Sequence, residues 1–260
     1  MQWHGERDIP VEVNDSHQWS LRYAPDSIAV ATAFLAAFNA KKMGVKYYVS
    51  QYMLNTPPQI SPTMDLAKML AKIEMIESLH SNIFTSYRQI RPGLLSFPVD
   101  LEVAKAQLVF SVTLGLMLNP QIIHVVAYSE SQYEAKAKEI IESVMMVNHI
   151  IEEYYRGFPS ALLADRYVRS QKEKLKYEAW VILEAVKKIG GGKDDSLTRP
   201  EVLTKAVEMG ILDAPQLQGS EVAKGNIATA IIDGACVTID PRTKKPLSEK
   251  QRIKRILDKT

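Results

Sequence analysis

Strand patterns alternate with helix patterns through the first half of the chain, and this alternation restricts the possible folds more than any other feature. Runs of β-prone residues at 11–13, 46–50, 82–87 and 122–128 are each followed by a segment whose apolar residues have helical spacing. Strands that alternate with amphipathic helices favour parallel βαβ units with right-handed crossovers. We therefore expect an α/β fold in which four βα units form a parallel half-barrel of the TIM-barrel type.

The second part of the chain has a different pattern. Gly157-Phe158-Pro159 interrupts the helical spacing, which predicts a boundary there. On this division residues 1–157 form the half-barrel, and residues 158–260 form a C-terminal helical extension with a β-hairpin. Asp233-Gly234 is typical of a hairpin turn, and Gly225-Asn226 is the alternative position for that turn.

Composition and charge limit the classes of function. The 260 residues are 46% hydrophobic and 24% charged, as in globular proteins, and the net charge of +2 gives no argument for binding nucleic acid or membrane. Cys236 is the only cysteine, so the sequence predicts neither a disulfide framework nor a cysteine metal site, and no other metal-ligand spacing is present. Neither a signal peptide nor a bilayer-spanning apolar run is visible, and we expect a cytoplasmic location.

Residues that directly follow the strands are the candidate ligand contacts, because ligands bind at the carboxyl ends of parallel strands. Arg88 and Arg91 lie together at a predicted strand end, where guanidinium groups could hold a carboxylate or phosphate in bidentate fashion. The alternative is that both arginines bind solvent or nearby acids. The predicted substrate-binding residues are Asn14, His17, Gln51, Asn55, Arg88 and Arg91.

A second polar group follows the fourth predicted strand. It consists of Tyr128, Ser129 and Glu130. Glu130 could act as a general acid or base where a partner or a low dielectric tunes its pKa, and we predict Glu130 and Tyr128 as catalytic residues. Capping of the next helix is the alternative function of this group, because Ser129 stands where an N-cap residue would.

Several segments resemble one protein family in the same order along the chain. They are Ala24-Pro25-Asp26-Ser27, Gly44-Val45-Lys46, Tyr87-Arg88-Gln89 with Phe97-Pro98, and residues 208–215 and 223–237. From Ala24 onward the chain resembles the C-terminal half of the catalytic epsilon subunit of glutamate mutase (methylaspartate mutase), an adenosylcobalamin-dependent isomerase built on a TIM barrel. The last two segments are the more specific, because a helix with a hairpin is not a generic part of a barrel.

The resemblance also implies a cofactor and a partner. In that family adenosylcobalamin is carried by a separate, small corrinoid-binding subunit that faces the barrel mouth, and the cofactor supplies the difficult chemical step. The resemblance places Tyr128, Ser129 and Ser131 on the cofactor side of this chain. A lysine and a glutamate that the family presents to the cofactor correspond approximately to Ala127 and Ser131, and a histidine of the preceding strand corresponds to Arg88.

A half-barrel on its own would expose unpaired strand edges and an inner face, which soluble proteins avoid. We therefore expect another chain to complete the barrel, either a complementary half-barrel subunit or a second copy of this chain. The leading prediction is a subunit of a cobalamin-dependent, glutamate mutase-like isomerase that rearranges a small carboxylate such as an amino acid. The alternatives are a non-catalytic structural subunit that completes a barrel with a partner, and a cobalamin-independent barrel that binds a small molecule.

Overall fold

The chain folds around a parallel sheet. The computed structural model describes residues 1–158 and 161–258, and all their side chains except those of residues 15–17 and 194. It contains a four-stranded parallel sheet in the order β1-β2-β3-β4. The strands are Val11–Glu12 (β1), Tyr47–Leu54 (β2), Thr85–Pro92 (β3) and Ile122–Ile123 (β4). The predicted α/β class and parallel pairing are confirmed.

The third strand lies further along the chain than predicted. β3 begins at Thr85 and ends at Pro92, whereas the sequence predicted a strand at residues 82–87. A tight turn precedes β3, in which the backbones of Ser81 and Phe84 pair with each other. The apolar residues on which the prediction relied therefore belong largely to this turn.

Two other strands also end elsewhere than predicted. β2 continues to Leu54, so Gln51 lies within the strand and not in the loop after it. β4 ends at Ile123, well before the predicted end at residue 128. The last backbone bond from this segment to β3 runs from His124 N–H to the Ile90 carbonyl at 2.9 Å, after which the chain leaves the sheet.

Two of the crossover helices begin where the sequence supplies caps. Ser61 accepts a hydrogen bond from Met64 N–H, and Pro62 occupies the first turn, where a missing N–H is not needed. Asp100 caps the next helix through the N–H groups of Glu102 and Val103. The four long helices between and after the strands are Asp26–Lys42 (α3), Pro62–Glu77 (α4), Leu101–Leu116 (α5) and Ala137–Tyr155 (α6).

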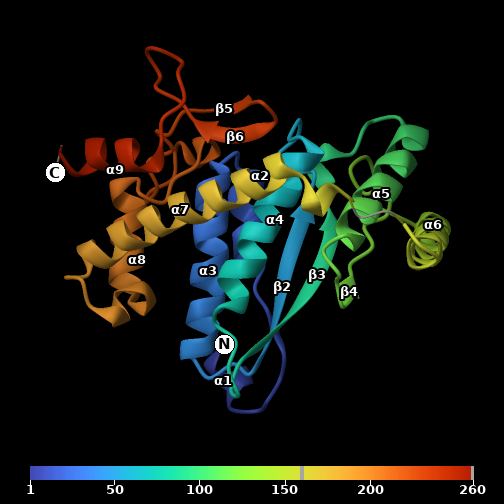
Figure 1. Cartoon of the computed structure of the whole chain (residues 1–260), viewed down its shortest axis with the longest axis horizontal. Helices are drawn as coiled ribbons and strands as arrows, with labels where there is room; N and C mark the ends of the chain where they lie inside the picture. The colour runs from blue at the N-terminus through green and yellow to red at the C-terminus, as the bar shows by residue number, and fades with distance from the viewer. Residues whose placement is uncertain (159–160, 259–260) are drawn as a thin grey trace.

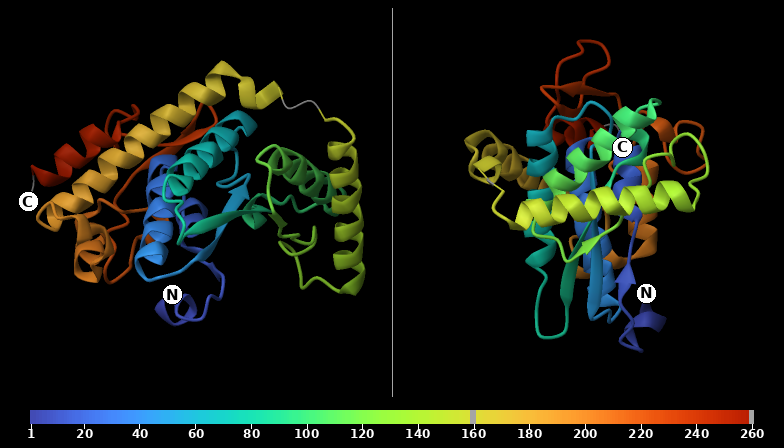
Figure 2. Two further views of the ribbon diagram at one scale, coloured as in Figure 1. Left: turned by 60° about the horizontal axis from the view of Figure 1, so that its bottom comes forward. Right: turned by 90° about the vertical axis from the view of Figure 1, so that its right-hand side faces the viewer.

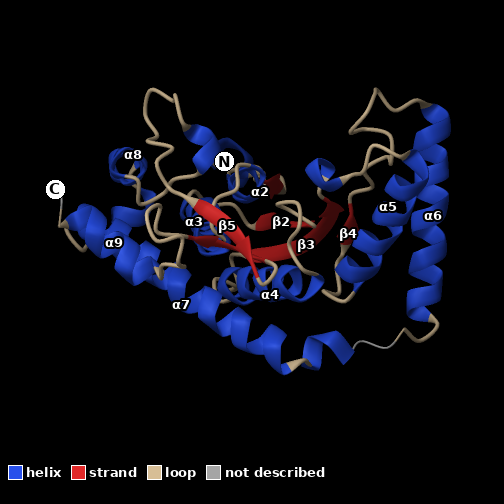
Figure 3. Ribbon diagram, turned by 90° about the horizontal axis from the view of Figure 1, so that it is seen from above, coloured by secondary structure: helices blue, strands red, loops and turns tan. Residues whose placement is uncertain are grey.

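The helices α3, α4 and α5 cover one face of the sheet (Figures 1 and 3). Alternate strand residues point into that helix layer, as the two-residue period of a strand requires. Tyr52, Leu54 and Ile90 are buried there with Leu66 of α4 and Leu114 of α5. We call the opposite face of the sheet the inner face.

The C-terminal part packs back onto the helices that cover the parallel sheet. Its elements are Arg166–Ile189 (α7), Pro200–Met209 (α8), the antiparallel hairpin Thr229–Ile232 (β5) and Ala235–Thr238 (β6), and Glu249–Leu257 (α9). The turn predicted at Asp233-Gly234 is confirmed, with φ of 50° and 74°. α7 crosses α3 and α4 (Figure 1), and its Leu183 shares a hydrophobic cluster with Ile28 and Phe84. The segments on either side of residue 157 are therefore joined by one core.

Shorter helices complete the structure. They are Gln2–Gly5 (α1), Asp15–Leu21 (α2) and the 3-10 turns Leu94–Ser96, Ala161–Ala164, Asp194–Thr198 and Pro215–Leu217. Figure 2 shows α6 at one end of the molecule and α9 at the other. In the described part of the chain, no helix combines the length and the apolar character needed to cross a bilayer.

Candidate functional site

Polar side chains gather on the inner face of the sheet. Gln51 of β2 stands beside Gln89 of β3 in the parallel register. Both side chains donate to Oε1 of Glu12 on β1, Gln51 at 2.7 Å and Gln89 at 2.9 Å. One carboxylate thus joins three adjacent strands, and Gln51 and Gln89 are almost completely buried.

Arg91 extends this cluster toward the carboxyl end of β3. It lies two residues beyond Gln89 and so points to the same face. Its Nε is buried without a hydrogen-bond partner in the described part of the chain, and the same is true of Oε1 of Gln51. Burial lowers the pKa of Arg91, while Glu130 and Glu12 oppose that shift. From strand geometry, the Cα atoms of Arg91 and Gln51 are about 8 Å apart.

His124 and Glu130 add titratable groups at the same end of the sheet. Partial burial and then the positive charge of Arg91 lower the pKa of His124, and the carboxylates of Glu12 and Glu130 act in the opposite direction. Glu130 accepts a hydrogen bond from Ala127 N–H at 2.8 Å and leaves its side chain exposed. The inner-face cluster therefore consists of Glu12, Gln51, Gln89, Arg91, His124 and Glu130.

Arg88 does not belong to this cluster. It lies within β3 on the helix side, where its Nε donates to Glu77 of α4 at 2.7 Å and its Nη1 to the Leu118 carbonyl at 2.6 Å. The hydrogen bond to Glu77 raises the pKa of Arg88. The prediction that Arg88 and Arg91 lie together after a strand was wrong, because β3 continues through both and they face opposite sides.

Asn55 is held in a separate set of buried contacts. It has a positive φ of 57°, and its backbone N–H donates to the Asp65 carboxylate. Its side-chain oxygen accepts from Ser111, and its carbonyl accepts from Ser96. These contacts fix the turn after β2 and leave Asn55 outside the inner-face cluster.

Asn14 and His17 lie in the segment that follows β1. Asn14 is exposed and precedes α2 without a side-chain capping bond. His17 is part of α2, but its side chain lies outside the described residues. Their predicted roles in substrate binding stay predictions.

Tyr128 packs into the helix layer. The Tyr128 hydroxyl donates to Glu142 of α6 at 2.6 Å, which raises the pKa of Tyr128, and Lys105 of α5 lies 4.8 Å from its ring centre. Ser129 is fully buried, and its Oγ has no hydrogen-bond partner in the described residues. Ser131 accepts a hydrogen bond from the neighbouring Gln132 side chain at 3.2 Å. Tyr128 therefore does not reach the inner face.

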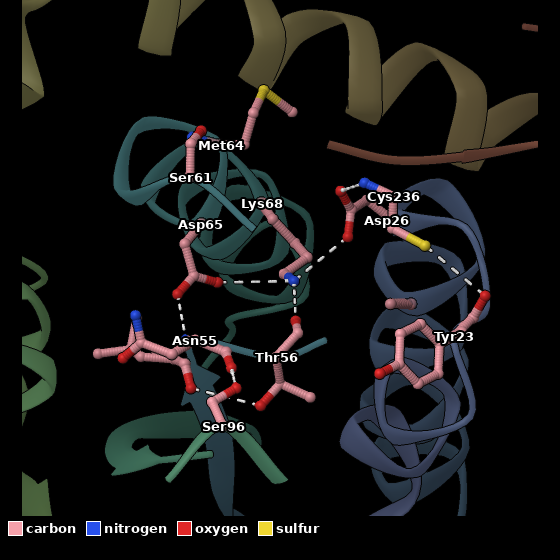
Figure 4. A network of polar contacts seen from close by, with 12 residues as sticks. Tyr23, Asp26, Asn55, Thr56, Ser61, Met64, Asp65, Lys68, Ser96 and Cys236 are labelled. Carbon is pink, nitrogen blue, oxygen red and sulfur yellow. Dashed lines mark hydrogen bonds and ion pairs between the residues drawn. The ribbon is translucent and has the colours of Figure 1, made fainter. Parts of the chain in front are cut away.

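A second polar cluster lies beneath the carboxyl end of β2, between α3 and α4 (Figure 4). Lys68 Nζ contacts Asp26 Oδ1 at 3.2 Å, Asp65 Oδ1 at 3.5 Å and the Thr56 carbonyl at 2.5 Å. Burial disfavours the charge on Lys68, but the two aspartates outweigh it and raise its pKa. Burial raises the pKa of Asp65 to about 6. Asp65 Oδ1 makes this ion-pair contact without a hydrogen bond, but each charged member has an ion-pair partner, and we assign this cluster a structural role.

Sequence reasoning missed Glu12, Gln89 and His124 as members of the inner-face cluster. The available signal was the alternation of polar and apolar residues along each strand, with Gln89 and Arg91 flanking the apolar Ile90. Among the described residues, no group of three or more His, Cys, Asp or Glu side chains is placed to hold a metal ion. No family model and no curated protein matches the chain.

Proposed function

We propose that this chain is half of a TIM-type barrel that binds a small carboxylate of the amino-acid type on its inner face. The observation that carries the proposal is the pair of buried, unpartnered atoms Arg91 Nε and Gln51 Oε1. One is a donor on a cationic group and the other an acceptor, and buried polar groups without partners are costly. A ligand with a carboxylate and an ammonium group would satisfy both.

The neighbouring groups suit such a zwitterion. Arg91 would hold the carboxylate through charge-assisted hydrogen bonds. Gln51, with Glu12 beside it, would accept hydrogen bonds from the ammonium group. Burial and the charge of Arg91 lower the pKa of His124, which favours its neutral ring, and an imidazole at the edge of the site can accept or donate a proton. Glu130 lies on the same side as a further carboxylate.

The reaction class that we propose rests on the resemblance to glutamate mutase: a carbon-skeleton isomerase in which a separate subunit carries adenosylcobalamin. The cofactor would supply radical chemistry at the carboxyl end of the barrel. Tyr128, one of the three residues expected to face it, does not fit this role, because it is buried against α5 and α6. We therefore assign this chain the binding and orientation of the substrate and derive no step through the cofactor.

A second candidate is a barrel that binds a small molecule without cobalamin, or that only completes the structure of a partner. The hydrogen bond from the Tyr128 hydroxyl to Glu142 favours this second candidate. Of the two predicted catalytic residues, only Glu130 has an exposed side chain. A barrel that binds a small molecule without cobalamin would keep Arg91 as the carboxylate contact.

Calorimetric titration tests the proposal. Glutarate, 4-aminobutyrate and L-glutamate would be titrated into the wild-type chain, Arg91→Gln and the matched control Arg88→Gln, with circular dichroism to confirm folding. We expect L-glutamate to bind more tightly than either analogue, Arg91→Gln to weaken its binding at least about tenfold, and Arg88→Gln to keep it. Equal binding to wild type and Arg91→Gln, or no binding of any of the three, would overturn the proposal.

A further inference from the structure

A pocket lies between α8, α9 and the open end of the hairpin, on the side of the molecule away from α5 and α6 (Figures 1 and 3). Its volume is about 590 Å³, which is within the usual range for small-molecule sites. Its lining comes from residues 209–213, 224–228, 238–242 and 247–256. The pocket therefore shares no residue with the inner-face cluster, and we call it the C-terminal pocket.

Three exposed cationic side chains from three different segments line the C-terminal pocket. Lys224 lies in the loop before β5, Arg242 in the loop after β6, and Arg255 on α9. Within the described part of the chain, neither Lys224 nor Arg242 makes a hydrogen bond or an ion pair through its side chain. Arg255 donates from Nη1 to Asp240 at 2.6 Å, which leaves its other guanidinium donors. These three side chains can therefore bind an anion in the pocket.

The two acidic residues of the lining already have partners. Asp213 accepts hydrogen bonds from the backbone N–H groups of residues 225–227, at 2.8, 2.9 and 3.2 Å. Asp240 accepts bonds from Arg255 and from two backbone N–H groups of its own loop, which hold the pKa of Asp240 well below its usual range. These bonds fix the two loops that carry the unpaired cations, and they leave neither carboxylate to neutralise those cations.

The surrounding segment is strongly basic. Residues 241–257 contain seven lysine and arginine residues and one acidic residue, although the net charge of the whole chain is only +2. The acidic residue is Glu249, which is buried and bonded to Arg252. A hollow that is lined by one sign of charge raises the local concentration of ions of the opposite sign. The C-terminal pocket therefore favours anionic ligands.

The remaining lining of the pocket is mostly apolar. It consists of Met209, Ile227, Ala228, Ile239, Leu247 and Ile256, with small or polar groups between them. A free inorganic anion would leave this wall without contacts, whereas a ligand with a flat or apolar body would cover it. Guanidinium groups bind phosphate oxygens in bidentate fashion, and three cations match an anion that carries more than one charge.

We propose that the C-terminal pocket binds a nucleoside diphosphate, with its phosphates between Lys224, Arg242 and Arg255 and its base against the apolar wall. A nucleoside diphosphate combines the multiple negative charge and the flat body that the two sides of the pocket require. This site is independent of the carboxylate site that we propose on the inner face of the sheet.

Calorimetric titration of the full chain with ADP, pyrophosphate and adenosine tests the proposal. We expect ADP to bind at least about tenfold more tightly than either fragment, because only ADP contacts both the cations and the apolar wall. Lys224→Gln and Arg242→Gln should each weaken ADP binding at least about fivefold. Both residues are exposed and lack described side-chain bonds, so both variants should fold, which circular dichroism would confirm.

The matched control is Lys250→Gln. Lys250 is an exposed lysine of α9 that does not line the C-terminal pocket, so its substitution removes the same charge from the same part of the molecule. We expect it to change ADP binding less than about twofold. Equal losses in Lys250→Gln and Lys224→Gln would show that only the general charge of the region matters and would overturn the proposal. The absence of ADP binding, or equal binding of ADP and pyrophosphate, would also overturn it.

A second comparison separates this site from the inner-face cluster. Arg91→Gln should bind ADP like the wild-type chain, and Lys224→Gln should bind L-glutamate like the wild-type chain. Loss of ADP binding in Arg91→Gln would place the nucleotide on the inner face and overturn the assignment to the C-terminal pocket. Binding of ADP by a chain that binds none of the three carboxylates would retain this inference and refute the proposed function.

Discussion

Arg88 and Arg91 lie on the same strand but face opposite sides of the sheet, because an odd spacing of three residues reverses the direction of a strand side chain. Arg88 is bonded to Glu77 and the Leu118 carbonyl, whereas Arg91 Nε has no partner in the described residues. We expect Arg88→Gln to lower the free energy of unfolding by about 1–2 kcal/mol and Arg91→Gln to leave it unchanged or raise it. Urea denaturation measures both. Equal losses in the two variants would contradict this assignment.

Lys68 should be among the most sensitive positions for stability. Its ammonium is fully buried between Asp26 and Asp65, and Lys68→Met leaves two buried carboxylates without their cation. Breaking a buried ion pair in this way costs about 3–5 kcal/mol. The control is Lys138→Met, because the Lys138 side chain is 78% exposed and its pair with Glu142 is long at 3.8 Å. We expect the control to change the free energy of unfolding by less than about 0.5 kcal/mol.

Lys72 should make stability depend on alkaline pH. Burial and the nearby charge of Lys68 lower the pKa of Lys72 to about 7, from 10.5. Between these two values the unfolded chain binds more protons at this residue than the folded chain, so its contribution to stability rises as the pH rises from about 7 to 10.5. Lys72→Met should remove this rise and stabilise the protein by at least about 1 kcal/mol at pH 7. Denaturation curves at pH 7 and pH 9 would show the difference, and parallel pH profiles for the two proteins would refute it.

Gly234 in the hairpin turn should tolerate no side chain. Its φ is 74°, and an added Cβ would lie 2.3 Å from Cβ of Ser61 at the start of α4. Gly44 has a similar φ of 80°, but a Cβ there meets nothing within 4 Å. In both alanine variants the left-handed backbone costs about 1 kcal/mol. Only in Gly234→Ala does the added Cβ also push the hairpin away from α4. Its melting temperature should fall clearly further than that of Gly44→Ala, and equal shifts would count against this packing.

Local signals predicted the turn of the C-terminal hairpin. The Asp233-Gly234 turn depends on backbone preferences of the residues themselves, and it lies where expected. The limits of β3 were predicted wrongly for two reasons. Phe84 is apolar and β-prone although it lies in a turn, and Gln89 is polar although it lies in the strand.

Contacts between distant segments set the rest of the site. Charged residues on a helix usually face solvent, yet Asp65, Lys68 and Lys72 of α4 are buried. Their burial depends on α3, the β2 turn and the C-terminal extension, which no window of sequence around α4 contains. The hydrogen bond between Arg88 and Glu77 could not be predicted for the same reason, because the two residues come from different elements.

The hairpin also determines when this protein can fold. Asp26 on α3 receives the N–H of Cys236 at 2.9 Å, and Ser61 N–H donates to the Gly234 carbonyl at 2.9 Å. Asp26 thus obtains a hydrogen-bond donor from a segment 210 residues further along the chain. A nascent chain that ends after α6 lacks the Cys236 N–H that Asp26 accepts, so native packing around Asp26 must await synthesis of the hairpin.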